Sequence, residues 1–161
     1  MKAFGIEYLN GFAMTGERSW PPSVFSSENK MLEKSPLLMG VKDCETINMV
    51  ATFTGSAFKA PEESIPVLGF LKDHYSLQPD TAWRFTSITP SQNLGGFLQG
   101  ALLPFGKGKI AVFGEAAMFT AQIVNGTMKV GINAEDAPQN AQFTLNLIHW
   151  LDGEEGRGGT R

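Results

Sequence analysis

The segment GKGKIAVFGEAAMF (residues 106–119) constrains the fold of this 161-residue chain more than any other. Its glycine-lysine-glycine start gives the backbone the freedom that a tight hairpin turn requires. Residues 110–113 then have the length and β-branched content of a fully buried strand. Gly114 permits a sharp turn after that strand, and Glu115 lies where the strand would lead into a helix. The segment therefore predicts a strand with a carboxylate at its carboxyl end, where ligands bind in open α/β sheets.

Three further apolar runs predict additional strands. Residues 95–105 should pair with residues 109–113 as an antiparallel hairpin across the glycine-lysine-glycine turn. Residues 47–53 predict a second good strand, which ends at a threonine-glycine-serine sequence. Residues 65–71 are apolar but contain Pro66, which cannot donate a hydrogen bond to a neighbouring strand. We therefore expect this last run at the edge of a sheet.

A C-terminal helix is the clearest single element in the sequence. Asp136 can cap it, Gln139 completes the spacing of a capping box, and Pro138 falls in the first turn, where its missing N–H is harmless. Gly153 should end the helix, and we expect the polar residues 154–161 to be a disordered tail. One buried stripe at helical spacing is predicted, made of Phe143, Leu147, Trp150 and Leu151.

The remaining segments are less regular. Residues 72–92 are rich in turn formers and predict a loop, in which Trp83 and Phe85 serve as anchors. Residues 4–14 predict a short strand or an irregular edge. Together these elements give one mixed α/β domain over residues 1–153, mostly β sheet with the C-terminal helix packed on it.

Charge and hydropathy exclude two classes of partner. The net charge is -3 and lysines and arginines form no cluster, so we expect no nucleic acid. Apolar runs stay well short of the ~20 residues that span a bilayer, so we expect no membrane partner. Residues 1–7 contain an acid and do not form a signal peptide, and the compartment is not determined by the sequence. Charged residues make up 18%, below the ~25% of typical domains, which favours a surface partly covered by a partner.

Nucleophilic catalysis finds little support in the residues. Cys44 lies between Asp43 and Glu45, acids that disfavour a thiolate, and no glycine beside it could form a tight strand-to-helix turn. His149 falls beside the apolar stripe of the predicted helix, where a partly buried structural histidine is expected. His74 falls in the predicted loop, where solvent exposure is expected. We therefore assign no catalytic residue.

Other site chemistries are also poorly matched. The sequence around Ser56 lacks the second glycine of a serine-hydrolase elbow. Histidines, the cysteine and the acids show no metal-ligand spacing, so we expect no metal. The glycine-lysine-glycine loop precedes a strand rather than a helix, so its amides should serve the hairpin instead of a phosphate. We expect no cofactor.

Four polar residues remain as candidates for binding a small-molecule ligand. Glu115 could accept a hydrogen bond from a ligand hydroxyl or amine, or it could instead stabilise the start of the following helix. Asn133 and Asn140 could line the same crevice, or they could be a turn residue and a helix-start residue. Ser56 follows the strand over residues 47–53 and completes the candidate set.

Two segments taken together resemble a known superfamily. Residues 106–116 (GKGKIAVFGEA) followed by residues 140–151 (NAQFTLNLIHWL) resemble the C-terminal end of class I glutamine amidotransferase-like proteins. Residues 35–40 (SPLLMG) and 53–56 (FTGS) are similar to their middle region. The resemblance implies part of a flavodoxin-like sheet, lacking the first strands and the nucleophile region. The chain would then be a fragment, a truncated domain, or a domain completed by forming a homo-oligomer.

Two functions follow as hypotheses. The first is a non-catalytic α/β binding or assembly domain that resembles the C-terminal half of a glutamine amidotransferase-like protein. The second is a hydrolase or transferase of that superfamily, with a site around Glu115 completed by another chain. The absence of a nucleophile in a suitable sequence context favours the first.

Overall fold

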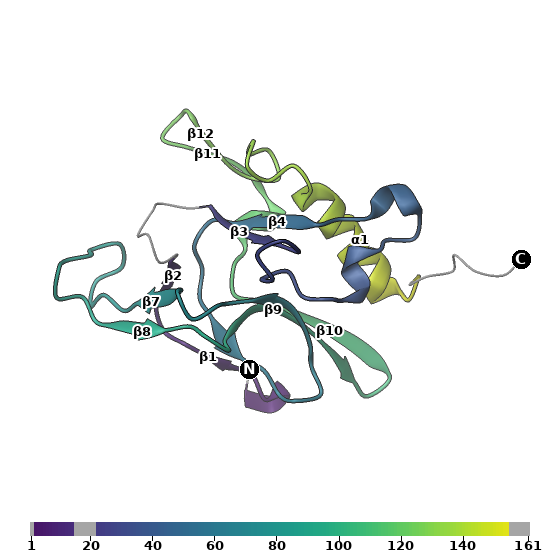
Figure 1. Cartoon of the computed structure of the whole chain (residues 1–161), viewed down its shortest axis with the longest axis horizontal. Coiled ribbons are helices and arrows are strands. Elements are labelled where there is room, and N and C mark those ends of the chain that lie inside the picture. Colours follow the sequence, from purple (N-terminus) through teal and green to yellow (C-terminus); the bar gives the residue numbers. More distant parts are fainter. Residues whose placement is uncertain (1, 15–21, 155–161) are drawn as a thin grey trace, which may run out of the picture.

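The computed structural model describes residues 2–14 and 22–154, in which short antiparallel strands pack against one long helix (Figure 1). Every strand pair in this described part of the chain is antiparallel. The mixed, mostly β character with a C-terminal helix is therefore confirmed. The strands are β1 (Glu7–Tyr8), β2 (Phe12–Met14), β3 (Ser23–Ser26), β4 (Met49–Thr52), β5 (Phe58–Lys59), β6 (Ile65–Gly69), β7 (Tyr75–Leu77), β8 (Ser91–Asn93), β9 (Leu98–Phe105), β10 (Gly108–Phe113), β11 (Ala121–Val124) and β12 (Met128–Gly131). The helices are α1 (Asn140–Asp152) and the 3-10 turns η1 (Lys2–Phe4), η2 (Pro36–Leu38), η3 (Asp43–Glu45) and η4 (Ala117–Phe119).

Strand β9 is the centre of the largest sheet. It pairs along its length with β10, from Phe105 opposite Gly108 to Gly100 opposite Phe113, which confirms the predicted hairpin. Gly106 has φ 58° at the first position of the two-residue turn, as a type II′ turn requires. On its other side β9 pairs with β6, whose only strand partner in the described chain is β9, and the sheet continues through β5 to β1. Residues 31–33 bond to the other side of β6 at Val67 and Gly69, and Pro66 lies just beyond them, at an edge that no named strand of the described chain pairs with, as expected.

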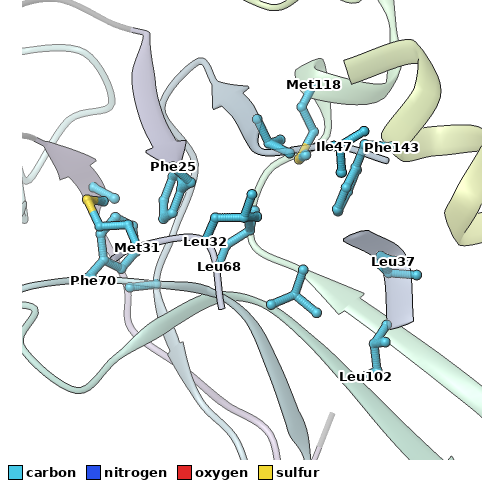
Figure 2. Close-up of a cluster of buried hydrophobic side chains, with 14 of the residues drawn as sticks. Phe25, Met31, Leu32, Leu37, Ile47, Leu68, Phe70, Leu102, Met118 and Phe143 are labelled. Atoms are coloured by element: carbon cyan, nitrogen blue, oxygen red, sulfur yellow. The ribbon is translucent and has the colours of Figure 1, made fainter. Parts of the chain in front are cut away.

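The main core lies between this sheet, the β3–β4 pair and α1 (Figure 2). Phe25, Leu68, Leu102, Met118 and Phe143 are all fully buried and bring β3, β6, β9, η4 and α1 into one cluster. Burial of each such side chain contributes about 1.5–3 kcal/mol relative to exposure. The core therefore ties η4 and α1 firmly to the sheet.

Side chains at the start of α1 complete the free edge of β4. Oε1 of Gln139 accepts hydrogen bonds from the backbone amides of Asn48 and Met49, each at 2.9 Å. Oδ1 of Asn140 accepts from the Ala51 amide at 2.9 Å, and its Nδ2 donates to the Ala51 carbonyl at 2.7 Å. Strand β4 pairs with β3 on its other side. The two side chains therefore satisfy the groups that a further strand would otherwise bond.

The helix itself differs from its predicted limits at the start. It begins at Asn140, and Asp136 is exposed four residues earlier, because consecutive backbone turns at residues 131–140 occupy the intervening chain. The prediction that Asp136 caps α1 was therefore wrong. The predicted end is confirmed, since Gly153 follows α1 with φ 84°. Of the predicted buried stripe, Phe143 and Trp150 are buried, Leu147 is half-buried and Leu151 is exposed.

Three other expectations need correction or fall outside the described residues. Residues 72–92 are not simply a loop, because they contain β7 and the start of β8, which pair with each other and with β2. Residues 110–113 are not fully buried: only Val112 is, because β10 is the end strand of its sheet. The predicted tail, apart from exposed Glu154, lies outside the described residues. In the part of the chain that is described, no helix combines the length and apolarity needed to cross a membrane.

Candidate functional site

Two distant segments cross backbone to backbone where β10 ends. The Ser56 amide donates a 2.8 Å hydrogen bond to the Gly114 carbonyl. A Cβ on Gly114 would lie 1.8 Å from the Ser56 carbonyl oxygen, and a Cβ on Gly55 would lie 2.5 Å from the Gly114 carbonyl oxygen. Only glycines allow this approach. The crossing fixes the segment after β4 directly against Glu115.

The Glu115 carboxylate is held at this crossing by backbone amides. The residue is 7% exposed. One carboxylate oxygen accepts from the Ala117 amide at 2.6 Å and the other accepts from the Met118 amide at 2.8 Å. Glu115 therefore stabilises the start of η4, which is one of its two predicted roles. The following element is not the predicted helix, however, because η4 lasts one turn and leads into the β11–β12 hairpin.

The surroundings of Glu115 also set its protonation. Burial raises the pKa of Glu115 above that of an exposed glutamate, although the backbone amides of Met118, Ala117 and Phe53 act in the opposite direction. The two carboxylate oxygens have four lone pairs between them, so the three backbone amides leave accepting capacity on the group. The group can accept a further hydrogen bond from a hydroxyl or an amine.

Glu115 lines a hollow of about 370 Å³, here called the Glu115 hollow. One wall is a face of the β11–β12 hairpin, whose cross-strand pairs Gln122 with Val130 and Val124 with Met128 place these side chains on the same side. In Figure 1 this hairpin projects from the body of the molecule beside β4. The remaining lining residues are Pro22, Phe53, Thr54, Trp83, Glu115, Ala117, Lys129 and Asp136.

A second hollow of about 500 Å³ contains Ser56 and is here called the Ser56 hollow. The Ser56 hydroxyl donates to the Gly11 carbonyl at 2.9 Å, so its proton is already used within the protein. The lining residues come from the β1–β2 connection, the segment after β4 and the β7–β8 loop: Asn10, Gly11, Phe12, Thr54, Gly55, Ser56, Gln78, Pro79, Asp80, Ala82 and Trp83. The described lining therefore contains both polar and aromatic side chains.

Thr54 and Trp83 line both hollows, and both have positive φ values. Thr54 has φ 101° and Trp83 has φ 68°, values that are unusual for β-branched or bulky residues. The Thr54 carbonyl accepts a 2.7 Å hydrogen bond from Nε2 of Gln99, a buried residue of β9. The Trp83 ring packs 4.6 Å from Phe12 and 6.5 Å from Phe85, centroid to centroid. These contacts hold the strained backbone and the indole in place.

The sequence candidates divide into two groups. Glu115 and Ser56 lie at the crossing and line the two adjoining hollows. Asn140 is 0% exposed and bonds to β4, so it is a structural residue and not a ligand-binding one. Asn133 lines neither hollow, although its Nδ2 donates to the Gln122 carbonyl on β11 at 3.3 Å and its Oδ1 is buried without a partner.

The histidines and the cysteine lie away from the lining of both hollows. His74 is buried, with Nδ1 2.8 Å from an Asp73 carboxylate oxygen, so the expectation that it is exposed was wrong. His74 directly precedes β7 and is therefore not part of a free loop. Cys44 is an exposed free thiol. Within residues 2–14 and 22–154, no three histidine, cysteine or acidic side chains gather as a metal site would require.

Sequence reasoning recognised Trp83 only as a loop anchor and did not single out Thr54. The one available signal was the threonine-glycine pair directly after a strong strand, a position where unusual backbone angles occur. The chemistry of the two hollows must therefore be inferred from their own residues. Comparison with protein-family models, curated proteins and solved structures found no match to this chain.

Proposed function

We propose that this chain is a non-catalytic binding domain whose small-molecule ligand occupies the Glu115 hollow and the adjoining Ser56 hollow. The observation that carries the proposal is the position of Thr54 and Trp83. These two residues line both hollows and both have positive φ values. Strained residues of this kind cost about 1–3 kcal/mol each and cluster at ligand-binding and active sites.

The strain is selective in its location. In the described part of the chain, positive φ occurs at four residues other than glycine: Lys30, Thr54, Trp83 and Asn125. Asn125 forms the tip of the β11–β12 hairpin, where asparagine tolerates such angles. Trp83 is the third residue of a turn that the Arg84 amide closes on the Thr81 carbonyl at 3.0 Å, a position that has positive φ in a type II turn. Glycine or asparagine is the usual residue there, and a tryptophan at this position, like a β-branched threonine at residue 54, is unusual. A role in shaping a binding surface accounts for both.

The size and lining of the hollows agree with a ligand site. Their volumes, about 370 and 500 Å³, fall in the range of small-molecule pockets, about 300–1,000 Å³. The Glu115 hollow combines an apolar wall on β11–β12 with a buried carboxylate that retains accepting capacity. This combination of an apolar wall with a few placed polar groups is typical of binding pockets.

The alternative of a hydrolase or transferase has less support. The described lining of both hollows includes no histidine and no cysteine, and the Ser56 hydroxyl donates to the Gly11 carbonyl. Nucleophilic catalysis would require an activating base within hydrogen-bond reach. Such a base would have to come from another chain, as the sequence hypothesis assumed.

A relationship to glutamine amidotransferase-like proteins remains a proposal of ancestry. Its support is the residue pattern of residues 106–116 and 140–151 and the mixed α/β character of the domain. A flavodoxin-like sheet is built from parallel strands, whereas the described strands pair antiparallel. The proposed binding function does not depend on this relationship.

Thr54→Gly tests the proposed function. Removing the side chain relieves the strain at φ 101°, so this variant should be as stable as the parent or up to about 1 kcal/mol more stable. It should bind any ligand of the hollows more weakly. Thr46→Gly is the control: Thr46 is exposed with φ -65°, and the change should cost about 0.5–1 kcal/mol without affecting binding.

A fragment library monitored by amide chemical shifts supplies the ligands for this test. Binding that shifts the amides of Thr54 and Glu115 and that weakens in Thr54→Gly supports the proposal. Fragments that bind only elsewhere, or with equal affinity to both proteins, would show that the strain has no role in binding.

Assembly is a second candidate function, favoured by the outer face of α1. Leu145, Ile148 and Leu151 are exposed there, and residues 140–151 contain no acidic or basic side chain other than one histidine. We propose that two copies of this face pack together, since a neutral apolar face meets its own copy without charge repulsion. Light scattering should give a dimer that Ile148→Glu, but not Ile88→Glu in the β7–β8 loop, converts to monomer. A parent protein that is monomeric at high concentration would rule this out.

A further inference from the structure

The charges around the two hollows restrict the chemistry of their ligand. Among the described lining residues there are three acids and one base: Glu115, Asp136 and Asp80 against Lys129. A phosphate, carboxylate or sulfate on the ligand would face a surplus of negative charge. The ligand should therefore be neutral or cationic.

The hydrogen bonds and the burial of the Glu115 carboxylate argue against a cationic ligand. Both of its carboxylate oxygens already accept backbone hydrogen bonds, from Ala117 and Met118, and the group is 7% exposed. A buried carboxylate that is solvated by backbone amides is a poor counter-ion for an ammonium group, which would itself lose its hydration on entering. A neutral hydroxyl can bond the remaining lone pairs without that cost.

The other polar groups are mostly both donors and acceptors. The described lining offers the side-chain amides of Asn10, Gln78 and Gln122 and the Thr54 hydroxyl, together with the Ser56 hydroxyl oxygen as an acceptor, since the Ser56 proton is donated to the Gly11 carbonyl. These groups come from four separate parts of the chain: Gln122 lines the Glu115 hollow, Thr54 lines both hollows, and the others line the Ser56 hollow. A ligand with several hydroxyls, which also donate and accept, matches such a lining better than a ligand with one functional group.

Trp83 adds a flat apolar surface between the hollows. Its side chain is 54% exposed, yet its ring packs against Phe12 and Phe85, and its backbone is fixed at φ 68°. An exposed indole that is held rigidly offers a large contact area at low cost in conformational entropy. The C–H face of a sugar ring is an apolar surface that can pack on the exposed part of this indole.

We propose that the ligand is a neutral oligosaccharide that occupies both hollows, with one sugar ring stacked on Trp83 and hydroxyls bonded to Glu115 and to the amide side chains. This inference rests on the proposed binding function and names the class of its ligand. The chain contributes only binding and orientation here, so no bond of the sugar is made or broken.

The test uses a panel of neutral trisaccharides that differ in sugar and linkage, beside matched panels of aliphatic and aromatic amines and of carboxylic acids and phosphates. Binding to the full chain is measured by tryptophan fluorescence and by calorimetry. We expect at least one neutral trisaccharide to bind, with an affinity that changes little with salt, because the contacts are between uncharged groups and a shielded carboxylate.

Two variants locate the bound sugar, and one variant serves as control. Trp83→Ala should weaken binding about tenfold or more, and Gln122→Ala, on the exposed hairpin, should weaken it about threefold or more. Ile88→Ala, exposed in the same loop as Trp83, should leave the affinity unchanged. Thermal melts of all three establish that a loss of affinity is not a loss of fold.

The outcomes separate the two proposals. Binding of an amine or an acid that Trp83→Ala weakens, with no trisaccharide bound, overturns the sugar assignment and leaves the binding function standing. A trisaccharide that binds with equal affinity to parent, Trp83→Ala and Gln122→Ala also overturns the assignment. If no compound of any class binds in a way that depends on Trp83, both the sugar assignment and the proposed function fail.

Discussion

Asn140→Ala should be among the most destabilising single substitutions in this protein. The Asn140 side chain is completely buried and bonds both backbone groups of Ala51 and, at 3.3 Å, the Met118 carbonyl. These bonds join the start of α1 to β4 and to η4. Alanine cannot replace any of them, and the site is closed to solvent.

The magnitude follows from the groups that are left without partners. The Ala51 N–H and C=O would each lose a hydrogen bond in a buried position, at about 1–3 kcal/mol per group. The sum is about 2–6 kcal/mol, and partial relaxation reduces it, so we expect a loss of about 2–4 kcal/mol. For a chain of this size that corresponds to a fall in Tm of about 10 °C. The total stability of a domain is about 5–15 kcal/mol, so the variant should still fold.

Urea unfolding followed by circular dichroism measures this loss as a lower midpoint with an unchanged slope. Asn133→Ala is the matched control, because Asn133 is half-buried and makes one 3.3 Å hydrogen bond; it should cost less than about 1 kcal/mol. If Asn140→Ala costs as little as Asn133→Ala, the side chain does not complete the edge of β4. Its original interpretation as a ligand-binding residue would then be open again.

Three further predictions concern the crossing beneath the hollows. Gly114→Ala should prevent folding or cost more than about 4 kcal/mol, because its Cβ would lie 1.8 Å from the Ser56 carbonyl oxygen. The control is Gly108→Ala in the neighbouring turn, which should cost no more than about 1 kcal/mol because the nearest atom to its Cβ would be 3.7 Å away. Denaturant unfolding measures both losses. Burial raises the pKa of Glu115, so the folded state binds the proton of its carboxyl group more tightly than the unfolded state does. The free energy of unfolding therefore falls as the pH rises from the pKa of the unfolded state through the pKa of the folded state. Glu115→Gln should therefore flatten the stability profile above about pH 4, where an unperturbed glutamate titrates, and an unchanged slope would contradict the assigned cause. Gln99→Leu should weaken ligand binding by releasing the Thr54 carbonyl, and unaltered affinity in a folded Gln99→Leu protein would show that this bond does not position Thr54.

The parts of the fold that were predictable are those in which one local pattern decides the structure. The β9–β10 hairpin follows from a glycine at the turn and apolar residues on both sides. The end of α1 follows from Gly153, because a left-handed residue stops a helix whatever it packs against. The start of α1 was missed because the chain turns repeatedly before Asn140. The decisive bonds there join side chains to a strand about 90 residues away in sequence.

The candidate site shows the same division. Glu115 was recognisable because it follows an apolar strand. From that position its carboxylate bonds the first amides of η4 and lines the Glu115 hollow, which are the positions that its two predicted roles require. Trp83 could not be assigned to the site from sequence, because its loop meets Phe12 only through the pairing of β2 with β7. Thr54 carries no pattern that reveals a φ of 101°, since its carbonyl is bonded by Gln99 of β9, which lies far from it in sequence.

The indole N–H signals of the three tryptophans give the most direct test of the binding function. A ligand added to the labelled protein should shift the Trp83 signal, because Trp83 lines both hollows. The signal of Trp150, a buried residue of α1, should stay in place as an internal reference. A saturable shift of Trp83 that is weakened in Thr54→Gly is the predicted result. A Trp83 signal that no ligand moves would contradict the assignment of these hollows as a binding site.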